Sequence, residues 1–156
     1  MNVEHGLKTI IIGIVLAVFL LPGVVIAEDV NWVTYDKAMT MAKKQDKPIL
    51  VYFFTKWCGY CRKMDKEVFK DAPVVKYLNE KFISVRLDTE KNDKNKKIAS
   101  SYKVRSYPST WFLKSDGAKI SNLPGFVPAT SMINILKFLG SGSYEKMSFQ
   151  DFLAKP

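Results

Sequence analysis

The chain has 156 residues and a net charge of +9, from 24 basic and 15 acidic side chains. Hydrophobic residues make up 47% and charged residues 25%, a balance typical of a globular protein of one domain. The only histidine is His5, and there are two cysteines. His5 lies in an N-terminal segment that we expect to be removed, so the mature chain would have no histidine for Ser-His-Asp or Cys-His catalysis. Two cysteines without a histidine also argue against a tetrahedral zinc site, and two cysteines cannot form a scaffold of several disulfides.

The first 27 residues have the layout of a secretory signal. Lys8 precedes an uncharged run from Ile10 to Ala27, and Pro22-Gly23 interrupts that run near its end. We predict a signal peptide over 1–27, cleaved after Ala27, and a periplasmic or otherwise exported domain over 28–156. The alternative is an uncleaved membrane anchor, because the run is near the lower limit of roughly 17–25 residues for a spanning helix. In both cases the cysteines reach a compartment where disulfides form and persist.

Apolar periodicity and turn residues predict these elements in chain order: a strand (30–33), a helix (from Thr34 or Asp36 to about Lys44), a strand (49–54), a helix (58–70), a helix (73–80), a strand (82–87), a helix (93–102), a strand (109–113), a strand (119–122), a helix (130–139) and a short final helix (148–153). The unbroken apolar run Ile49–Phe54 is typical of a strand buried on both faces. Asp116-Gly117 predicts a hairpin, and Gly140 and Gly142 are expected to end the helix before them. This order predicts an α/β fold, with a central mixed sheet flanked by helices on both faces and a short C-terminal helical extension.

The segment Cys58-Gly59-Tyr60-Cys61 stands where a strand gives way to a helix. Cysteines three residues apart can close and reopen a small disulfide ring with little backbone movement. Cys58 would lie at the helix N-terminus, where free N–H groups and the helix dipole stabilise a thiolate, and Cys61 would be buried one turn further on. The spacing therefore predicts that Cys58 is the nucleophile and that Cys61 resolves the mixed disulfide. A structural disulfide, which would contribute only about 2 kcal/mol for so short a ring, and half of a metal site are the alternatives.

The segment PILVYFFTKWCGYC, followed by Tyr107-Pro108 before a later strand and hairpin, resembles the thioredoxin superfamily. More narrowly it is similar to exported thioredoxin-like proteins of the Dsb type. These include the C-terminal domain of the membrane electron transporter DsbD and the thioredoxin-like proteins of sulfur-oxidation gene clusters. The resemblance covers roughly Trp32 to Leu139. It implies the thioredoxin fold and a redox-active disulfide between Cys58 and Cys61, with no metal and no other cofactor.

The resemblance also implies a substrate groove beside the cysteines. Pro108 matches the proline that is cis in this fold, and Tyr107 would offer its backbone N–H and C=O groups to an extended substrate. The substrate-binding residues implied in this way are Trp57, Gly59, Tyr60, Tyr107, Pro108, Gly125 and Phe126. Ordinary aromatic packing is the alternative for Trp57 and Tyr107, and an ordinary trans turn is the alternative for Pro108.

The chain departs from the family pattern at two points. Thioredoxins commonly carry a buried Asp six residues before the first cysteine, where this chain has Tyr52, so the usual proton acceptor for Cys61 is missing. Arg86 lies either near the site or on the surface. The Gly-Tyr dipeptide also lacks the His that strong oxidants carry between their cysteines. We therefore expect a reduction potential between about −270 mV, the thioredoxin value, and about −180 mV, the isomerase value.

The leading hypothesis is an exported thiol–disulfide oxidoreductase that reduces or reshuffles disulfides in exported proteins and is served by a membrane electron-transfer partner of the DsbD type. The alternatives are a peptide-binding module or chaperone that uses the same groove, and a dedicated electron donor to one client in cytochrome c maturation or sulfur oxidation. The charged cluster Glu90–Lys97 is either a solvated helix start or a docking patch for an acidic partner or anionic lipid. No nucleic-acid partner is expected, and membrane contact is expected only if the N-terminal segment is uncleaved.

Overall fold

The computed structural model describes residues 28–155 of the chain. The predicted signal peptide and its cleavage site lie outside these residues. None of the helices within the described range is long and apolar enough to cross a membrane.

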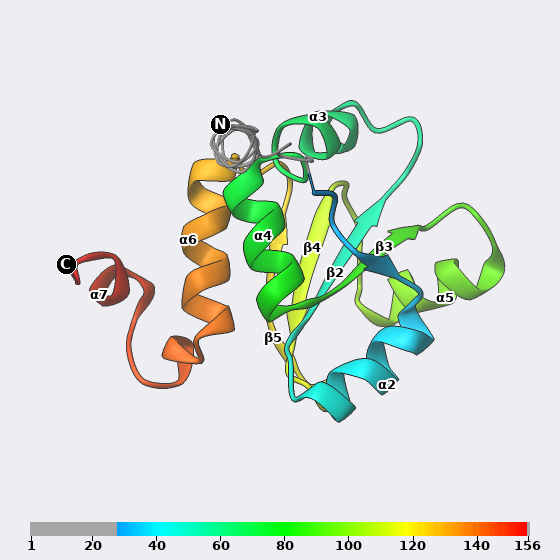
Figure 1. Ribbon diagram of the computed structural model, residues 1–156. Coiled ribbons are helices and arrows are strands. Elements are labelled where there is room, and N and C mark those ends of the chain that lie inside the picture. The colour runs from blue at the N-terminus through cyan, green and yellow to red at the C-terminus, as the bar shows by residue number, and fades with distance from the viewer. Residues whose placement is uncertain (1–27, 156) are drawn as a thin grey trace, which may run out of the picture.

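Strands and helices follow one another in the order expected from the sequence (Figure 1). The strands are β1 (Trp32–Val33), β2 (Ile49–Phe54), β3 (Ile83–Asp88), β4 (Ser109–Leu113) and β5 (Lys119–Pro124). The helices are α2 (Tyr35–Gln45), α3 (Gly59–Glu67), α4 (Ala72–Lys81), α5 (Asp93–Ser101), α6 (Ala129–Gly140) and α7 (Phe149–Leu153), with a 3-10 turn η1 (Ser143–Glu145). The 3-10 turn η1 was not predicted, and the other differences are at element ends. The largest is at α3, which ends at Glu67 and not at Lys70, while β1 begins at Trp32 and not at Val30, and β5 continues to Pro124.

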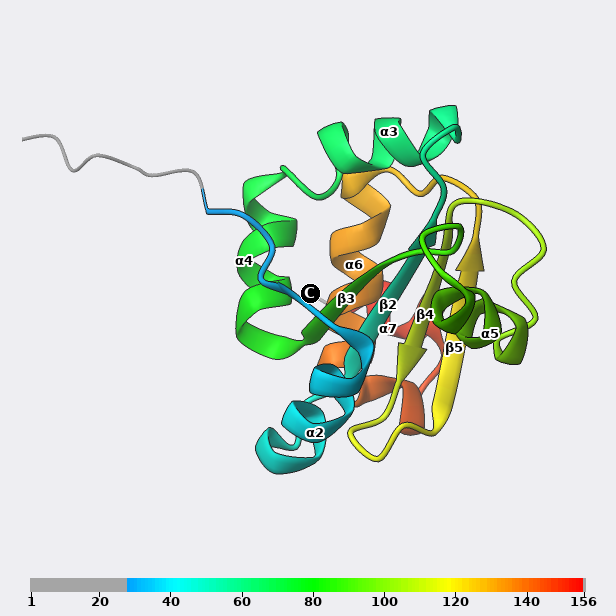
Figure 2. The same ribbon diagram turned by 90° about the vertical axis from the view of Figure 1, so that its right-hand side faces the viewer.

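The strands form one mixed sheet in the order β1-β3-β2-β4-β5. β1, β3 and β2 run parallel, whereas β4 and β5 are antiparallel to their neighbours. In Figure 1, α4 and α6 lie on one side of the sheet and α2 and α5 on the other, and Figure 2 shows α3 crossing the end of the sheet. The predicted α/β architecture is confirmed.

β2 occupies the centre of the sheet and is buried along its whole length. Its side chains alternate between two cores. Leu50, Tyr52 and Phe54 pack with residues of α3, α4 and α6, and the odd-numbered residues of β2 pack with residues of α2 and α5. Burying an aliphatic or aromatic side chain contributes roughly 1.5–3 kcal/mol. The apolar run therefore ties both helical layers to one strand.

The sheet brings three chain segments to the same edge. β2 and β4 are antiparallel with Phe53 opposite Ser109, so the end of β2 meets the start of β4. β3 is parallel to β2 with Asp88 opposite Phe54, so β3 ends at this edge as well. The residues after β2, the residues after β3 and the residues before β4 therefore lie together.

The helix predicted to end before Gly140 includes this glycine, one residue more than the sequence predicted. Gly140 is the last residue of α6, and an added Cβ would lie 2.9 Å from a ring carbon of Phe82 and 3.0 Å from one of Tyr77. Close packing thus accounts for this glycine. The helix ends at Gly140, with Ser141 as its C-cap, and Gly142 follows with a φ of 71°, in the left-handed region that favours glycine.

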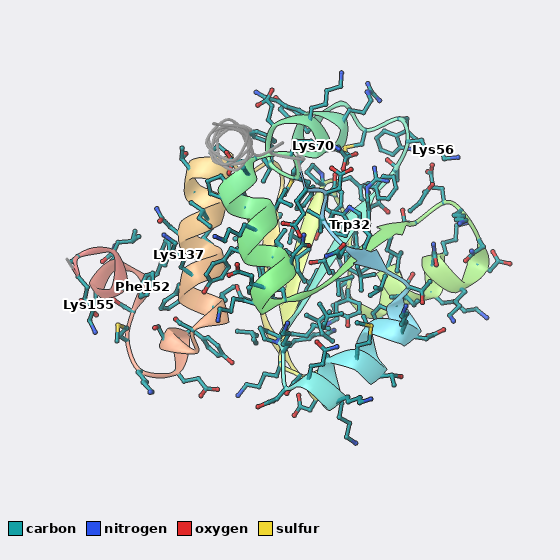
Figure 3. All side chains as sticks on the ribbon, viewed as in Figure 1. Trp32, Lys56, Lys70, Lys137, Phe152 and Lys155 are labelled. Carbon is teal, nitrogen blue, oxygen red and sulfur yellow. A yellow bond between two sulfur atoms is a disulfide. The ribbon has the colours of Figure 1, made fainter. Side chains whose placement is uncertain are left out.

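The predicted C-terminal extension packs on α6. The ring of Phe138 lies 5.3 Å from those of Phe149 and Phe152, measured between centroids. Figure 3 labels Phe152 on α7, beside α6. The extension is therefore attached on the outer side of the α4 and α6 layer.

Candidate redox-active site

A disulfide joins Cys58 to Cys61 where β2 passes into α3. Cys58 is the N-cap of the helix, and the backbone N–H of Cys61 donates to Cys58 Sγ over 3.0 Å. An N-terminal N–H and the positive end of the helix dipole both favour negative charge. The same geometry would stabilise a thiolate on Cys58 after reduction.

Both cysteines are buried, Cys61 more completely. Cys58 is 5% exposed and Cys61 is 1% exposed. Cys61 faces the core together with Met64 and Val68, as the helical spacing predicts. By contrast, Trp57, which directly precedes Cys58, is 65% exposed.

Two exposed aromatic side chains, Trp57 and Tyr60, border the disulfide loop. Together with their partners Tyr107 and Phe126 they form what we call the aromatic rim. Trp57 packs edge-on against Tyr107, with 6.0 Å between ring centroids, and Tyr60, itself 64% exposed, lies 6.3 Å from Phe126. The Lys63 ammonium sits 4.7 Å above the Phe126 ring. Exposed aromatic groups of this kind are enriched where proteins bind one another.

The segment before β4 supplies Tyr107 to the aromatic rim. The peptide bond between Tyr107 and Pro108 is cis, as the family resemblance implies. The Gly125 N–H donates to the Pro108 carbonyl over 2.7 Å, which ties the end of β5 to this loop. Gly125 has a φ of 84°, so a side chain here would be strained. Gly125 and Pro108 are thus brought together, and so are the two aromatic pairs. Their roles in binding substrate stay predictions.

Two residues that the sequence did not identify support the aromatic rim from the end of β3. The Trp57 indole N–H donates to Glu90 Oε1 over 2.9 Å. The buried Thr89 hydroxyl donates to the Tyr107 hydroxyl oxygen over 2.8 Å. The signal that could have located them is topological: parallel strands joined by a helix end at the same edge, so the residues after β3 lie beside those after β2.

Tyr52 occupies the position, six residues before Cys58, where the family resemblance implies a buried acid. It is fully buried, and its hydroxyl donates to the Cys61 carbonyl over 3.2 Å. Burial raises the pKa of Tyr52 well above its ordinary value, and the nearby Asp65 carboxylate raises it further. Tyr52 therefore acts as a hydrogen-bond donor at neutral pH and not as a base.

The sequence left open whether Arg86 lies near the site or on the surface, and the structure shows both features. The Arg86 guanidinium reaches Asp65 twice, with Nη2 2.6 Å from Oδ2 and Nε 3.3 Å from Oδ1. It also lies 3.9 Å above the Phe54 ring. Asp65 is one helical turn after Cys61 on α3, and the ion pair is partly open to solvent.

The described residues contain no cluster of three or more His, Cys, Asp or Glu side chains that could hold a metal ion. A dithiol at a helix N-terminus can exchange with an external disulfide.

Comparisons with known proteins agree with this geometry. Residues 35–140 match the family profile described as a thioredoxin-like domain. The chloroplastic M-type thioredoxin of Triticum aestivum is 32% identical over 120 residues, which cover 76% of this chain and 61% of that protein. The disulfide bond reductase DsbH of Chlamydia pneumoniae is 25% identical over 111 residues, which cover 65% of this chain and 66% of that protein. The chain thus spans less than two thirds of the length of either relative.

Two solved structures extend the comparison. A putative disulphide-isomerase from Bacteroides thetaiotaomicron is 30% identical with a TM-score of 0.63, and the match covers 76% of this chain and 98% of that one. The oxidised C-terminal domain of DsbD from Neisseria meningitidis is 26% identical with a TM-score of 0.56, and the match covers 65% of this chain and 90% of that one.

Proposed function

Since the chain belongs to the thioredoxin-like domain family, we propose that it is a thiol–disulfide oxidoreductase whose working group is the Cys58–Cys61 pair. The observation that carries this proposal is the position of the pair, with Cys58 as the N-cap of α3 and the Cys61 N–H on its sulfur. In the reducing direction, the Cys58 thiolate attacks a substrate disulfide and expels one substrate thiolate. Cys61, as a thiolate, then attacks Cys58 and expels the second. Two electrons pass to the substrate, its two sulfurs take up protons, and the pair becomes a disulfide.

Burial supports the order of attack. Only the Cys58 sulfur can accept the Cys61 N–H, and only Cys58 borders the exposed Trp57. Cys61 faces the core, where an incoming protein disulfide cannot approach. Cys58 is therefore the group that meets substrate, and Cys61 acts within the molecule.

An extended substrate would lie between the two aromatic pairs of the rim. Trp57 with Tyr107 forms one pair and Tyr60 with Phe126 the other. Backbone pairing at Tyr107 would recognise main chain more than sequence, as in other cases of strand addition. The substrates would then be many exported proteins with disulfides and not one sequence.

The direction of electron flow is proposed to be reduction or reshuffling. The two residues between the cysteines are Gly59 and Tyr60, so no imidazole stabilises the Cys58 thiolate. The Chlamydia relative is described as a disulfide bond reductase, and the Neisseria relative is a domain of DsbD. We propose export, guided by the segment 1–27, and re-reduction by a membrane electron-transfer partner of the DsbD type.

The test is the reduction potential of the full-length protein in defined thiol buffers, together with two single substitutions. Cys61→Ser should trap a mixed disulfide with a substrate, and Cys58→Ser should not. A potential near about −120 mV would make the protein an oxidant and reject the proposed direction. If Cys58→Ala retained full activity on an unfolded client, the chaperone alternative would replace the redox mechanism.

A further inference from the structure

Within residues 28–155, one edge of β3 has no strand partner over its second half. β1 pairs only Trp32 with Ser84 and Val33 with Val85. The chain then turns into α2 at Tyr35. No strand of the described part of the chain therefore lies beside the outer side of Arg86–Asp88. Unpaired edges of this kind can accept an extended segment of another chain.

The backbone groups on that edge can be assigned from the bonds on the other side. The N–H of Ile83 donates to Pro48 and the N–H of Thr89 donates to Phe54, both toward β2. Peptide directions alternate along a strand, so odd-numbered residues of β3 face β2. The peptide groups of Arg86 and Asp88 consequently face the open edge.

Two of these backbone groups, the Arg86 C=O and the Asp88 N–H, are the ones to which an added parallel strand would bond. The Asp88 carbonyl already accepts from Asn95 Nδ2 over 2.8 Å. The Arg86 C=O and the Asp88 N–H take no part in the loop and cap bonds of the described residues. They flank Leu87, and one extended residue opposite Leu87 could donate to the first and accept from the second.

A groove of about 670 Å³ lies in front of this edge. Its charged lining residues are Lys56, Arg86, Lys91 and Lys94 against Asp36 and Asp88. Arg86 is paired with Asp65, and Lys94 is paired with Asp36. Within residues 28–155, Lys56 and Lys91 have no ion-pair partner. The groove therefore has two uncommitted positive charges beside the free backbone pair.

We propose that this groove binds an extended acidic segment of a partner polypeptide, which adds to β3 along the line that β1 leaves at Val33. Its backbone would bond to Arg86 and Asp88, and its carboxylates would lie against Lys56 and Lys91. A polypeptide is favoured over a lipid because the groove offers backbone hydrogen bonds and not charge alone.

The groove adjoins the redox site. Lys56 precedes Trp57, and Lys91 follows Glu90, which holds the Trp57 indole. A segment bound here would bring its protein to the disulfide from the side opposite the Pro108 loop. The inference rests on the proposed function only in treating this protein as a redox partner, because binding itself needs neither cysteine.

The experiment uses the full-length protein and a labelled synthetic peptide of alternating Glu and Thr. We compare Lys56→Glu/Lys91→Glu with the matched pair Lys76→Glu/Lys137→Glu, which makes the same charge change on α4 and α6. Figure 3 labels Lys56 and Lys137 on opposite sides of the molecule. The groove pair should weaken binding about tenfold or more, and the control pair should leave it within about twofold. Cys58→Ser should bind as the wild type does, which separates this test from that of the redox function.

Hydrogen exchange at the Asp88 amide supplies the second readout, measured by NMR with and without the peptide. Exchange should slow when the peptide saturates the protein. If both charge-reversal pairs weakened peptide binding equally, the general attraction between a cationic protein and an acidic peptide would explain the binding, and the proposed groove would be rejected. Unchanged exchange at Asp88 would exclude strand addition. Binding of anionic vesicles through Lys56 and Lys91, with no peptide binding at millimolar concentration, would assign the groove to a membrane and overturn the proposal.

Discussion

The Trp57 indole N–H is held by the Glu90 carboxylate across 2.9 Å, so a residue after β3 fixes the aromatic side chain next to the nucleophilic position. Trp57 is exposed and also touches Tyr107. Its orientation therefore depends on two contacts from two different segments. This arrangement restrains a side chain that would otherwise move freely beside the disulfide.

Removing the Glu90 acceptor should slow exchange with substrate. We expect Glu90→Ala to lower kcat/KM for a disulfide-containing peptide about two- to tenfold, since a hydrogen bond of this kind contributes roughly 0.5–1.5 kcal/mol. Glu90→Gln keeps an acceptor and should retain most of the activity. Glu80→Ala on α4 is the control for loss of one acidic side chain. Equal activity of Glu90→Ala and the wild type would mean that the indole position is unimportant.

The buried tyrosines should make stability fall at high pH. Burial raises the pKa of Tyr52, and burial and the hydroxyl of Tyr35 raise that of Tyr102. The unfolded chain then loses these protons from about pH 10, where the folded chain still holds them. The free energy of unfolding should thus be constant near neutral pH and decrease above about pH 10. In denaturant titrations of the oxidised protein, Tyr52→Phe should reduce the slope, and parallel curves would contradict the assignment.

Tyr52→Phe also tests the bond to the Cys61 carbonyl. At neutral pH the substitution keeps the ring and removes the donor, so it should destabilise the fold by about 1 kcal/mol. The measurement is urea unfolding of the oxidised protein. Thr40→Val, which removes an exposed hydroxyl bond on α2, serves as the comparison and should cost less. A stability equal to that of the wild type would show that the Tyr52 hydroxyl contributes nothing there.

The Arg86–Asp65 ion pair should be stronger than an ordinary surface pair. It has two contacts and is only about one third exposed, whereas Lys63–Glu67 has a single 3.9 Å contact and is about half exposed. A double-mutant cycle with Arg86→Met and Asp65→Asn should give a coupling energy of about 1 kcal/mol. The same cycle on Lys63 and Glu67 should give about 0.3 kcal/mol. Equal couplings would remove any special role for the Arg86–Asp65 pair.

A methyl group at Gly140 should destabilise the protein despite its benefit to the helix. Alanine is favoured over glycine in a helix by about 1 kcal/mol, but the new Cβ would press on the rings of Phe82 and Tyr77. We expect a net loss of about 1–2 kcal/mol in thermal or chemical unfolding. Ser131→Ala, at an exposed position of the same helix, should be neutral or stabilising. A stabilised Gly140→Ala protein would show that the rings move aside at little cost.

The sequence was sufficient wherever local chemistry decides structure. The apolar run of β2, the spacing of Cys58 and Cys61 and the Asp-Gly hairpin each specify their conformation within a few residues. Contacts between segments far apart in the chain were not predictable in this way. The sequence places Glu90 in a charged cluster that is either a solvated helix start or a docking patch, and nothing local links it to Trp57. The sequence predicts a helix end near Gly140, but it does not show the close packing on Tyr77 and Phe82, because those rings come from α4 and its C-terminus.

The open half of β3 was equally hidden from local patterns. The strand predicted over 30–33 does end at Val33, but the sequence did not reveal that β3 lies beside it and continues three residues past the last pair, Val33 with Val85. The groove follows from that stop together with the start of α2. Such a feature depends on where two segments separate, which is a property of the folded chain.

The burial of β2 has a consequence for how the protein can fail. The loop with Cys58 is attached to the last residue of a strand that is enclosed by both cores. Amides in such a strand exchange only when the whole molecule opens, so local fraying at either end of the chain leaves the dithiol in place. A protease that trims the ends should therefore release an active fragment, and loss of activity on heating should coincide with cooperative unfolding.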